Sequence, residues 1–385
     1  MQLANVVSAL AITALAGLAS AQNANNTVVA NVQALNHTVD GKDYTLATAL
    51  KLAGSVQPVV DALNNSKNIT LFAPTDDAFK AFGAANPVQL VTVTSDPALT
   101  QKVLLYHTVG SKFLPAGQPA KQFIKTGDGN NWIQVDVNSG KVMLFFNGGN
   151  ATVIDSIPSS NGIVHVIDNV LQPPPSAVDD LKKEGLDTLI TQVQAANLTS
   201  AVSDLNNATL FAPTNNAFDT VLGFAKSNNL TLNATMLAGI LRFHVVPGTY
   251  FSTDIAAIKT AKLATLLAGQ SVNVTYDGSD VKLYGAGQTA LKLAPATVTK
   301  ADILVAGGVM HIIDAVLIPD LNAAVVSGND TTGANPNSTT NANGTTTTNN
   351  GTATGTGSAS KSSAAVLASS ALSVFGAVAA AVLLI

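Results

Sequence analysis

Apolar runs and polar turns alternate along most of the chain, and one ten-residue pattern occurs twice. Residues 70–79 (Thr-Leu-Phe-Ala-Pro-Thr-Asp-Asp-Ala-Phe) and residues 209–218 are identical at eight of ten positions. The Thr-Leu-Phe-Ala run is typical of a short buried strand. Proline ends that strand, and the following threonine (Thr75 or Thr214) is a good helix N-cap. Each copy therefore predicts a strand followed by a helix, and two copies predict a duplicated domain.

The remaining patterns of the first copy predict further helices and strands. Helical spacing predicts two short helices within 44–63, before the repeated strand, and another helix over 101–108. Alternation over 132–147, interrupted by Asn-Ser-Gly, predicts a β-hairpin. An apolar run over 162–171 predicts a buried closing strand, which ends at the three prolines 173–175.

The second copy repeats this order. Helical spacing over 186–205 precedes the repeated strand, and a further helix passes through 241–244. A hairpin is predicted over 271–284, turning at Asp-Gly, and a closing strand over 308–317. We therefore predict an α+β fold with the following segments: a signal peptide at 1–21, an N-terminal extension at 22–42, domain 1 at 43–172, a Pro-rich linker at 173–183, domain 2 at 184–320, a disordered Ser/Thr/Asn/Gly-rich stalk at 327–363 and a hydrophobic tail at 364–385.

The two ends predict secretion and a lipid anchor. An apolar run over 6–18 is followed by Ala-Ser-Ala, a small-x-small cleavage site, although no Lys or Arg precedes the run. The uncharged tail 364–385 follows small residues and a polar spacer, an order that predicts a glycosylphosphatidylinositol (GPI) anchor signal. The alternative is a membrane-spanning helix. The candidate attachment residues are Gly355, Gly357, Ser358 and Ser360.

Glycosylation is predicted by many Asn-x-Ser/Thr sequons, which in a secreted chain mark acceptor sites on the surface. We expect those in the stalk and loops to be used more often than the two beside the repeated strands. The fourteen sequons are at Asn25, Asn36, Asn64, Asn68, Asn150, Asn197, Asn207, Asn229, Asn233, Asn273, Asn329, Asn337, Asn343 and Asn350.

Composition excludes several classes of function. The formal net charge is −4, and Arg242 is the only arginine. Without a basic cluster, a nucleic-acid partner is not expected. The absence of cysteine removes disulfides and thiolate metal sites, and we expect no metal and no cofactor.

The repeated motifs together resemble the fasciclin-like domain family. They are Thr-Leu-Phe-Ala-Pro-Thr with a following Ala-Phe, then Tyr-His or Phe-His in the middle, then His-Val-Ile-Asp-Asn-Val-Leu or His-Ile-Ile-Asp-Ala-Val-Leu at the end. The resemblance implies a β-wedge with helices packed around it. It also implies extracellular adhesion or matrix binding, commonly by tandem domains on a lipid anchor. The Thr/Ser-rich stalk is most similar to that of fungal cell-surface members.

Two adhesion motifs of that family carry over in part. The Tyr-His pair is intact in the first copy, whereas the second copy has Phe in place of Tyr. A second motif places Asp-Ile before the closing strand, and the second copy resembles it with Ala301 in place of the usual polar or basic neighbour. The candidate contact residues implied by the resemblance are Tyr106, His107, Phe243, His244, Asp302, Ile303 and Leu304.

Some of these residues have alternative roles. The paired histidines could serve a hydrolase or a metal site, but no Gly-x-Ser-x-Gly or His-Glu-x-x-His accompanies them. We therefore expect them to form hydrogen bonds inside the fold. Asp76-Asp77 could be catalytic, but the second copy has Asn-Asn, which favours a helix-start role. Trp132 could stack on a sugar, and packing in the hairpin core is the favoured alternative.

We therefore predict a non-catalytic, secreted glycoprotein of the cell surface, with no catalytic residue, that mediates adhesion or binds the extracellular matrix or cell wall. It would lie at the outer face of the plasma membrane, in the cell wall, or both. Its expected partners are surface or wall glycans, surface proteins and a second copy of itself. The alternatives are a structural wall component without a discrete ligand and a carbohydrate-active enzyme.

Overall fold

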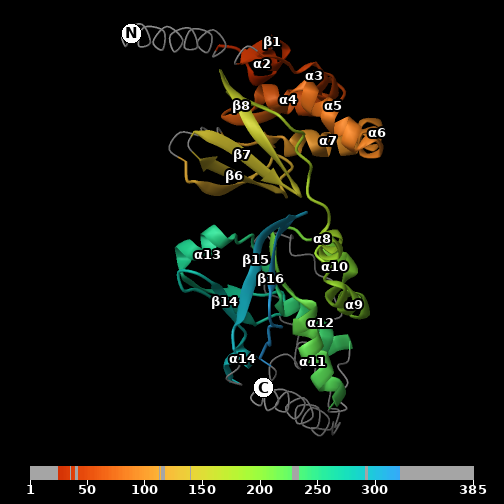
Figure 1. The fold of residues 1–385 in the computed structure, drawn as a ribbon, viewed down its shortest axis with the longest axis vertical. Helices are drawn as coiled ribbons and strands as arrows, with labels where there is room; N and C mark the ends of the chain where they lie inside the picture. The colour runs from red at the N-terminus through yellow and green to blue at the C-terminus, as the bar shows by residue number, and fades with distance from the viewer. Residues whose placement is uncertain are drawn as a thin grey trace, which may run out of the picture.

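The structure is a computed structural model. It describes residues 25–320 except 35, 40–41, 112, 114–117, 139, 228–233 and 291–293. These residues form two successive domains (Figure 1), which confirms the predicted α+β fold with tandem domains. The predicted signal peptide, stalk and anchor signal lie outside the described residues.

Domain 1 is built on a seven-stranded sheet with the order β4-β3-β9-β8-β7-β6-β5. Its first long strand, β3, pairs in parallel with its last, β9, and every other neighbouring pair is antiparallel. The strands are β3 (Ile69–Pro74), β4 (Thr108–Val109), β5 (Lys121–Lys125), β6 (Trp132–Asn138), β7 (Lys141–Phe146), β8 (Gly149–Ser159) and β9 (Gly162–Ile167).

The helices of domain 1 precede β3 or lie between β3 and β4. The predicted N-terminal extension contributes α2, whose Val28 and Val32 are buried in the domain core, so it is part of the domain. Strand β1 (Asn36–Val39) also lies in this extension, and it pairs with β2 (Lys42–Thr45), which begins at the last residue of the extension. The helices are α2 (Val28–Ala34), α3 (Ala47–Gly54), α4 (Gln57–Asn65), α5 (Asp76–Ala85), α6 (Pro87–Ser95) and α7 (Pro97–Tyr106).

Domain 2 repeats this topology with the order β11-β10-β16-β15-β14-β13-β12. Strand β10, which carries the second copy of the repeated motif, pairs in parallel with β16. The predicted hairpin is confirmed as β13 and β14. The strands are β10 (Ala208–Pro213), β11 (Val245–Pro247), β12 (Thr260–Ala264), β13 (Ser271–Tyr276), β14 (Val281–Tyr284), β15 (Ala296–Val305) and β16 (Gly308–Ile313).

The helices of domain 2 begin inside the segment predicted as a linker. Helix α8 starts at Ala177, capped by Ser176, and its Val178 and Leu181 are buried in the domain 2 core. The connection between the domains is therefore the short proline run before α8. The helices are α8 (Ala177–Lys183), α9 (Asp187–Ala195), α10 (Thr199–Ser203), α11 (Asn215–Ser227), α12 (Ala234–Phe243), α13 (Ser252–Ile258) and α14 (Ala286–Ala290).

The repeated motif forms the predicted strand, cap and helix in both domains. Thr75 Oγ1 accepts a hydrogen bond from the N–H of Ala78, and Thr214 caps α11 in the same way. The next residue has a further role. The Asp76 carboxylate accepts the N–H groups of two residues at the start of α3, whereas Asn215 accepts the N–H of Thr188 at the start of α9. Both side chains accept backbone N–H groups, which explains why the first copy can have Asp and the second copy Asn at this position.

Alternate residues of the repeated strand enter two apolar clusters in each domain. In β3, Ile69 and Ala73 belong to a cluster with the helices, whereas Phe72 points into the cluster formed by the antiparallel strands. In β10, Leu210 faces the helices and Phe211 the strands. The repeated strand is thus covered on both faces, as its apolar sequence predicts. No helix in the described part of the chain has the length and apolar character needed to cross a membrane.

Candidate functional site

Two buried histidines occupy matching positions in each domain. The middle histidine lies between α7 and β4 in domain 1 and between α12 and β11 in domain 2. Both nitrogens of its ring form hydrogen bonds with the backbone. His107 Nδ1–H donates to the Val103 carbonyl at 2.8 Å, and Nε2 accepts the N–H of Leu171 at 3.0 Å. His244 makes the same two bonds at 2.7 and 2.9 Å, the second to the N–H of Leu317. These partners fix both middle histidines in the Nδ1–H tautomer.

The closing-strand histidines carry the proton on the other nitrogen. His165 Nε2–H donates to the Phe113 carbonyl at 2.9 Å, and Nδ1 accepts the Ser156 hydroxyl at 2.7 Å. His311 Nε2–H donates to the Tyr250 carbonyl at 2.9 Å, and its Nδ1 accepts a backbone N–H. Both are therefore Nε2–H tautomers.

All eight ring nitrogens of these four histidines are occupied, so none is available as a general base or metal ligand. Burial lowers the pKa of His107 and His244 to about 4, and it also lowers the pKa of His165 and His311. Across the described residues, no three His, Asp or Glu side chains are grouped to hold a metal ion. The internal hydrogen bonding expected for these histidines is what the structure shows.

Four of the predicted contact residues lie in the domain cores. Tyr106 and Phe243 have no exposed surface, and His107 and His244 are buried beside them. The Tyr106 hydroxyl donates to the Trp132 carbonyl at 3.0 Å, and burial raises the pKa of this phenol. A partner that approaches the folded domains touches none of these four side chains. Their role in adhesion stays a prediction.

The other three predicted contact residues lie where the two domains meet. The Asp302 side chain is 5% exposed. Its carboxylate accepts the backbone N–H of Ser252 at 2.7 Å and forms an ion pair with Lys121 of domain 1 at 2.9 Å. Burial raises the pKa of Asp302, but these bonds outweigh burial and hold it below the usual value for aspartate. Ile303 is half-buried and Leu304 is buried, so this segment serves the contact between the domains.

An aromatic cluster lies beside this ion pair. Phe123 of β5 stacks on Phe251 of domain 2 with ring centroids 3.7 Å apart and planes at 2°. Trp132 meets the same Phe251 ring edge-on at 5.2 Å. We call Phe123, Trp132 and Phe251 the interdomain aromatic cluster. Trp132 therefore packs between domains, not only within its hairpin. Its partner is 119 residues away in sequence, which is why the sequence did not reveal this role.

Hydrogen bonds extend this interface. Asn131 Oδ1 accepts the N–H of Gly307 at 3.2 Å, and the N–H of Ala306 donates to the Pro175 carbonyl at 2.8 Å. Within domain 2, Lys300 Nζ donates to both carboxylate oxygens of Glu184, which follows α8. The β15–β16 turn is therefore fixed to domain 1 and to the linker, and the two domains form one packed pair.

The sequons of the described residues lie largely on the surface. Asn68 and Asn207, expected to be disfavoured by their closeness to a strand, are exposed in turns with φ of 59° and 49°. Asn273 is half-buried, and Asn36 lies in β1. Asn229 and Asn233 and the four stalk sequons lie outside the described residues. The exposed sequon residues are Asn25, Asn64, Asn68, Asn150, Asn197 and Asn207.

Helix α6 presents apolar side chains to solvent. It has no buried residue, and Val88 and Val91, one turn apart on one face, are 78% and 65% exposed. Leu99, at the start of α7, is 37% exposed. No sequon occurs between Asn68 and Asn150, so the chain from α5 to β7 has no predicted N-glycan. We call Val88, Val91 and Leu99 the α6 patch. Sequence periodicity did not identify it, because an exposed and a buried apolar residue look the same in a pattern.

The buried histidines predict a pH dependence of stability. Their folded pKa of about 4 lies below the ordinary value of 6.5, so the unfolded chain binds more protons between these limits. Stability should be fully present above pH 6.5 and decrease as the pH falls toward 4, by up to about 3 kcal/mol per middle histidine. Urea denaturation from pH 7.5 to 4.5 measures this, and His107→Gln should flatten the slope for domain 1. A slope that is flat in the parent protein would contradict neutral buried rings.

The interdomain aromatic cluster predicts a fixed pair. Phe123→Ala should leave both domains folded but broaden the interdomain distance distribution measured by single-molecule FRET, because the stack on Phe251 is lost. Phe145→Ala is the matched control, since Phe145 belongs to the same sheet but not to the cluster. Identical distributions for the two variants would show that the cluster does not hold the domains together.

The chain is similar to several known proteins. The chain is 28% identical to the transforming growth factor-beta-induced protein ig-h3 of Sus scrofa over 70% of its length, and covers 35% of that protein. It is 26% identical to a fasciclin-like arabinogalactan protein of Arthroderma benhamiae over 72% of its length, and covers 63% of that protein. The chain thus spans less than two thirds of both relatives.

The chain also matches a solved structure of a FAS1 domain pair from the insect cell adhesion molecule Fasciclin I. The match covers 71% of this chain and 97% of that structure, with 18% sequence identity and a TM-score of 0.34. The family model for the fasciclin domain matches residues 44–173 and 184–319, which together make up more than half of the chain. The chain therefore belongs to the fasciclin domain family.

Proposed function

We propose that this chain is a non-catalytic glycoprotein of the cell surface that binds a protein partner through the α6 patch, and so mediates adhesion or attachment to matrix or wall. The observation that carries the proposal is an exposed apolar surface in a stretch without sequons. Val88 and Val91 place exposed apolar surface on one face of α6, and apolar surface gathered on one face is typical of an interaction site. A partner can reach it only where glycans do not cover it.

The two domains differ at this place. In domain 2, the chain between α11 and α12, which corresponds in order to α6, contains the sequons of Asn229 and Asn233. Domain 1 has no sequon there and has exposed valines instead. The proposal therefore assigns binding to domain 1, with domain 2 as the rigidly attached neighbour that sets its orientation.

A protein partner fits the α6 patch better than a glycan. The large hydrophobic side chains exposed in the described residues are all aliphatic, and none is an aromatic ring on which a sugar could stack. Aliphatic surface is buried favourably against other apolar surface. The partner is a protein of the same or a neighbouring cell, and a second copy of this chain is one such protein. Many copies on one surface would add avidity to a weak single contact.

The surface location rests on the sequence and on relatives. A signal peptide, a glycan-rich stalk and a GPI signal are proposed from the two ends of the chain. The Arthroderma benhamiae relative, named as an arabinogalactan protein, is consistent with such a glycoprotein. A structural wall component without a discrete ligand is the second candidate, favoured by the same stalk.

The binding test uses paired variants of the secreted chain. Val88→Asp with Val91→Asp should reduce binding to intact cells at least tenfold, because charges replace the apolar surface. Ile258→Asp with Leu266→Asp, which changes exposed apolar residues of domain 2 (51% and 48% exposed), should leave binding unchanged. Equal binding of the two double variants would reject the α6 patch. Tyr106→Phe, which keeps the ring but removes the bond to Trp132, tests the family-implied site separately.

The anchor is tested on intact cells. Phosphatidylinositol-specific phospholipase C should release the chain from the cell surface if the predicted GPI anchor is present. Release by glucanase alone would support transfer of the stalk to wall polysaccharide. Recovery of the chain only after detergent, with its C-terminal tail retained, would show the membrane-spanning alternative and contradict the anchor.

A further inference from the structure

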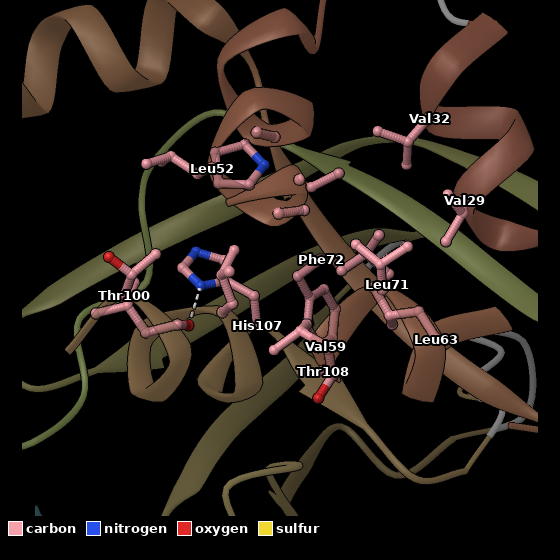
Figure 2. Close-up of a pocket in the computed structure, with 18 of the residues that line it drawn as sticks. Val29, Val32, Leu52, Val59, Leu63, Leu71, Phe72, Thr100, His107 and Thr108 are labelled. Atoms are coloured by element: carbon pink, nitrogen blue, oxygen red, sulfur yellow. Dashed lines mark hydrogen bonds between the residues drawn. The ribbon is translucent and has the colours of Figure 1, made fainter. Parts of the chain in front are cut away.

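A large cavity lies in domain 1 between strand β3 and the helices α2 to α7 (Figure 2). Its volume is about 260 Å³, and its wall is mainly aliphatic and aromatic, including Val32, Leu52, Val59 and Phe72. Protein interiors are close-packed and contain few voids larger than a water molecule. An engineered apolar cavity of about 150 Å³ stays dry and binds benzene. The domain 1 cavity is larger than that.

The threonine and histidine side chains in this wall are already bonded to the protein. The Thr100 hydroxyl donates to the Val93 carbonyl at 2.5 Å, and the Thr108 hydroxyl donates to the Leu105 carbonyl at 2.8 Å. Both ring nitrogens of His107 are occupied, one of them by the bond drawn in Figure 2. A water molecule inside would lack the two to four partners that hold buried water. The cavity therefore suits a molecule without polar atoms.

The cavity reaches the surface. Gln33, Gly54 and Gln57 line it and are themselves exposed. A Cβ atom built on Gly54 would meet no heavy atom within 4 Å, so this part of the rim is open space. A ligand can therefore enter between α2, α3 and α4 without unfolding the domain.

Domain 2 has a cavity at the equivalent place. Its volume is about 380 Å³, and Leu210, Phe211 and His244 line it, in the same repeat positions as Leu71, Phe72 and His107 of domain 1. The void thus recurs although many of the surrounding side chains differ between the repeats. A pocket that occurs at the same position in both repeats is therefore a feature of the fold, and not of one particular set of side chains. Arg242 lines the second cavity, whereas no charged side chain lines the domain 1 cavity.

We propose that the domain 1 cavity is a binding site for a hydrocarbon-like small molecule, of the size of one or two fused rings or a medium acyl chain. The contacts that hold it would be dispersion and burial of apolar area. The polar end of an amphiphilic ligand, where there is one, would lie at the rim near Gln33 and Gln57. This site is separate from the α6 patch, so either proposal can fail alone.

The test measures naphthalene binding to the secreted, delipidated chain. Saturable changes in the methyl resonances of Val59 and Leu63, both in the cavity wall, should accompany naphthalene binding in the parent protein. Ala49→Leu with Ala53→Leu places two larger side chains into the cavity from α3 and should weaken these changes at least tenfold. Ala62→Leu adds the same group on the exposed part of α4, outside the cavity, and should bind as the parent does.

Two results would overturn the proposal. One is the absence of any naphthalene-dependent shift of these methyl groups up to its solubility in water. The other is unchanged binding in the filled variant. Circular dichroism checks that the double variant is folded. If it is not, Val93→Phe replaces it, because Val93 lines the cavity and is only half-buried in α6.

Discussion

The parallel pairing of the first and last strands of each domain, fixed by neutral histidines, is the constraint on which the rest of the structure depends. Strands β3 and β9 begin 93 residues apart, and β10 and β16 begin 100 residues apart. Each middle histidine connects its helix to the chain just after the closing strand, and each closing histidine connects that strand to the loop after the second strand. Protonation of either ring would replace a hydrogen-bond acceptor by a buried charge. We call the parallel strand pair and its histidine hydrogen bonds the frame of each domain. The cavities, the cores and the interface between the domains are all built around it.

Local sequence patterns predicted the elements with clear periodicity. The strand, cap and helix of the repeat, both hairpins and both closing strands are where the pattern places them. Strand β4 has two residues and β5 has no buried residue, so neither gives a signal. Helices α2 and α8 are each only seven residues long and lie in polar surroundings, so the sequence predicts an extension and a linker there. Their burial depends on tertiary contacts that no short window contains.

The sites were predicted less well than the fold, for a related reason. The sequence analysis names Asp302 through a family motif and Trp132 as a residue that could stack on a sugar, but the partner of each lies in the other domain. Lys121 and Asp302 are 181 residues apart, and nothing local links them. Tyr106 and Phe243 resemble contact residues of a family, yet the fold places both in a core. Surface features such as the α6 patch become visible only when burial is known. The proposed functions therefore depend on the exposed α6 patch and on the domain 1 cavity, neither of which a sequence pattern reveals.

The tautomers of the four buried histidines test this frame most directly. Long-range ¹H–¹⁵N correlation spectra of the imidazole rings report which nitrogen carries the proton. We expect His107 and His244 as fixed Nδ1–H tautomers that are neutral at pH 6, and His165 and His311 as fixed Nε2–H tautomers. Titration of any of these rings near the ordinary pKa of 6.5, or averaging of its two tautomers, would contradict the account.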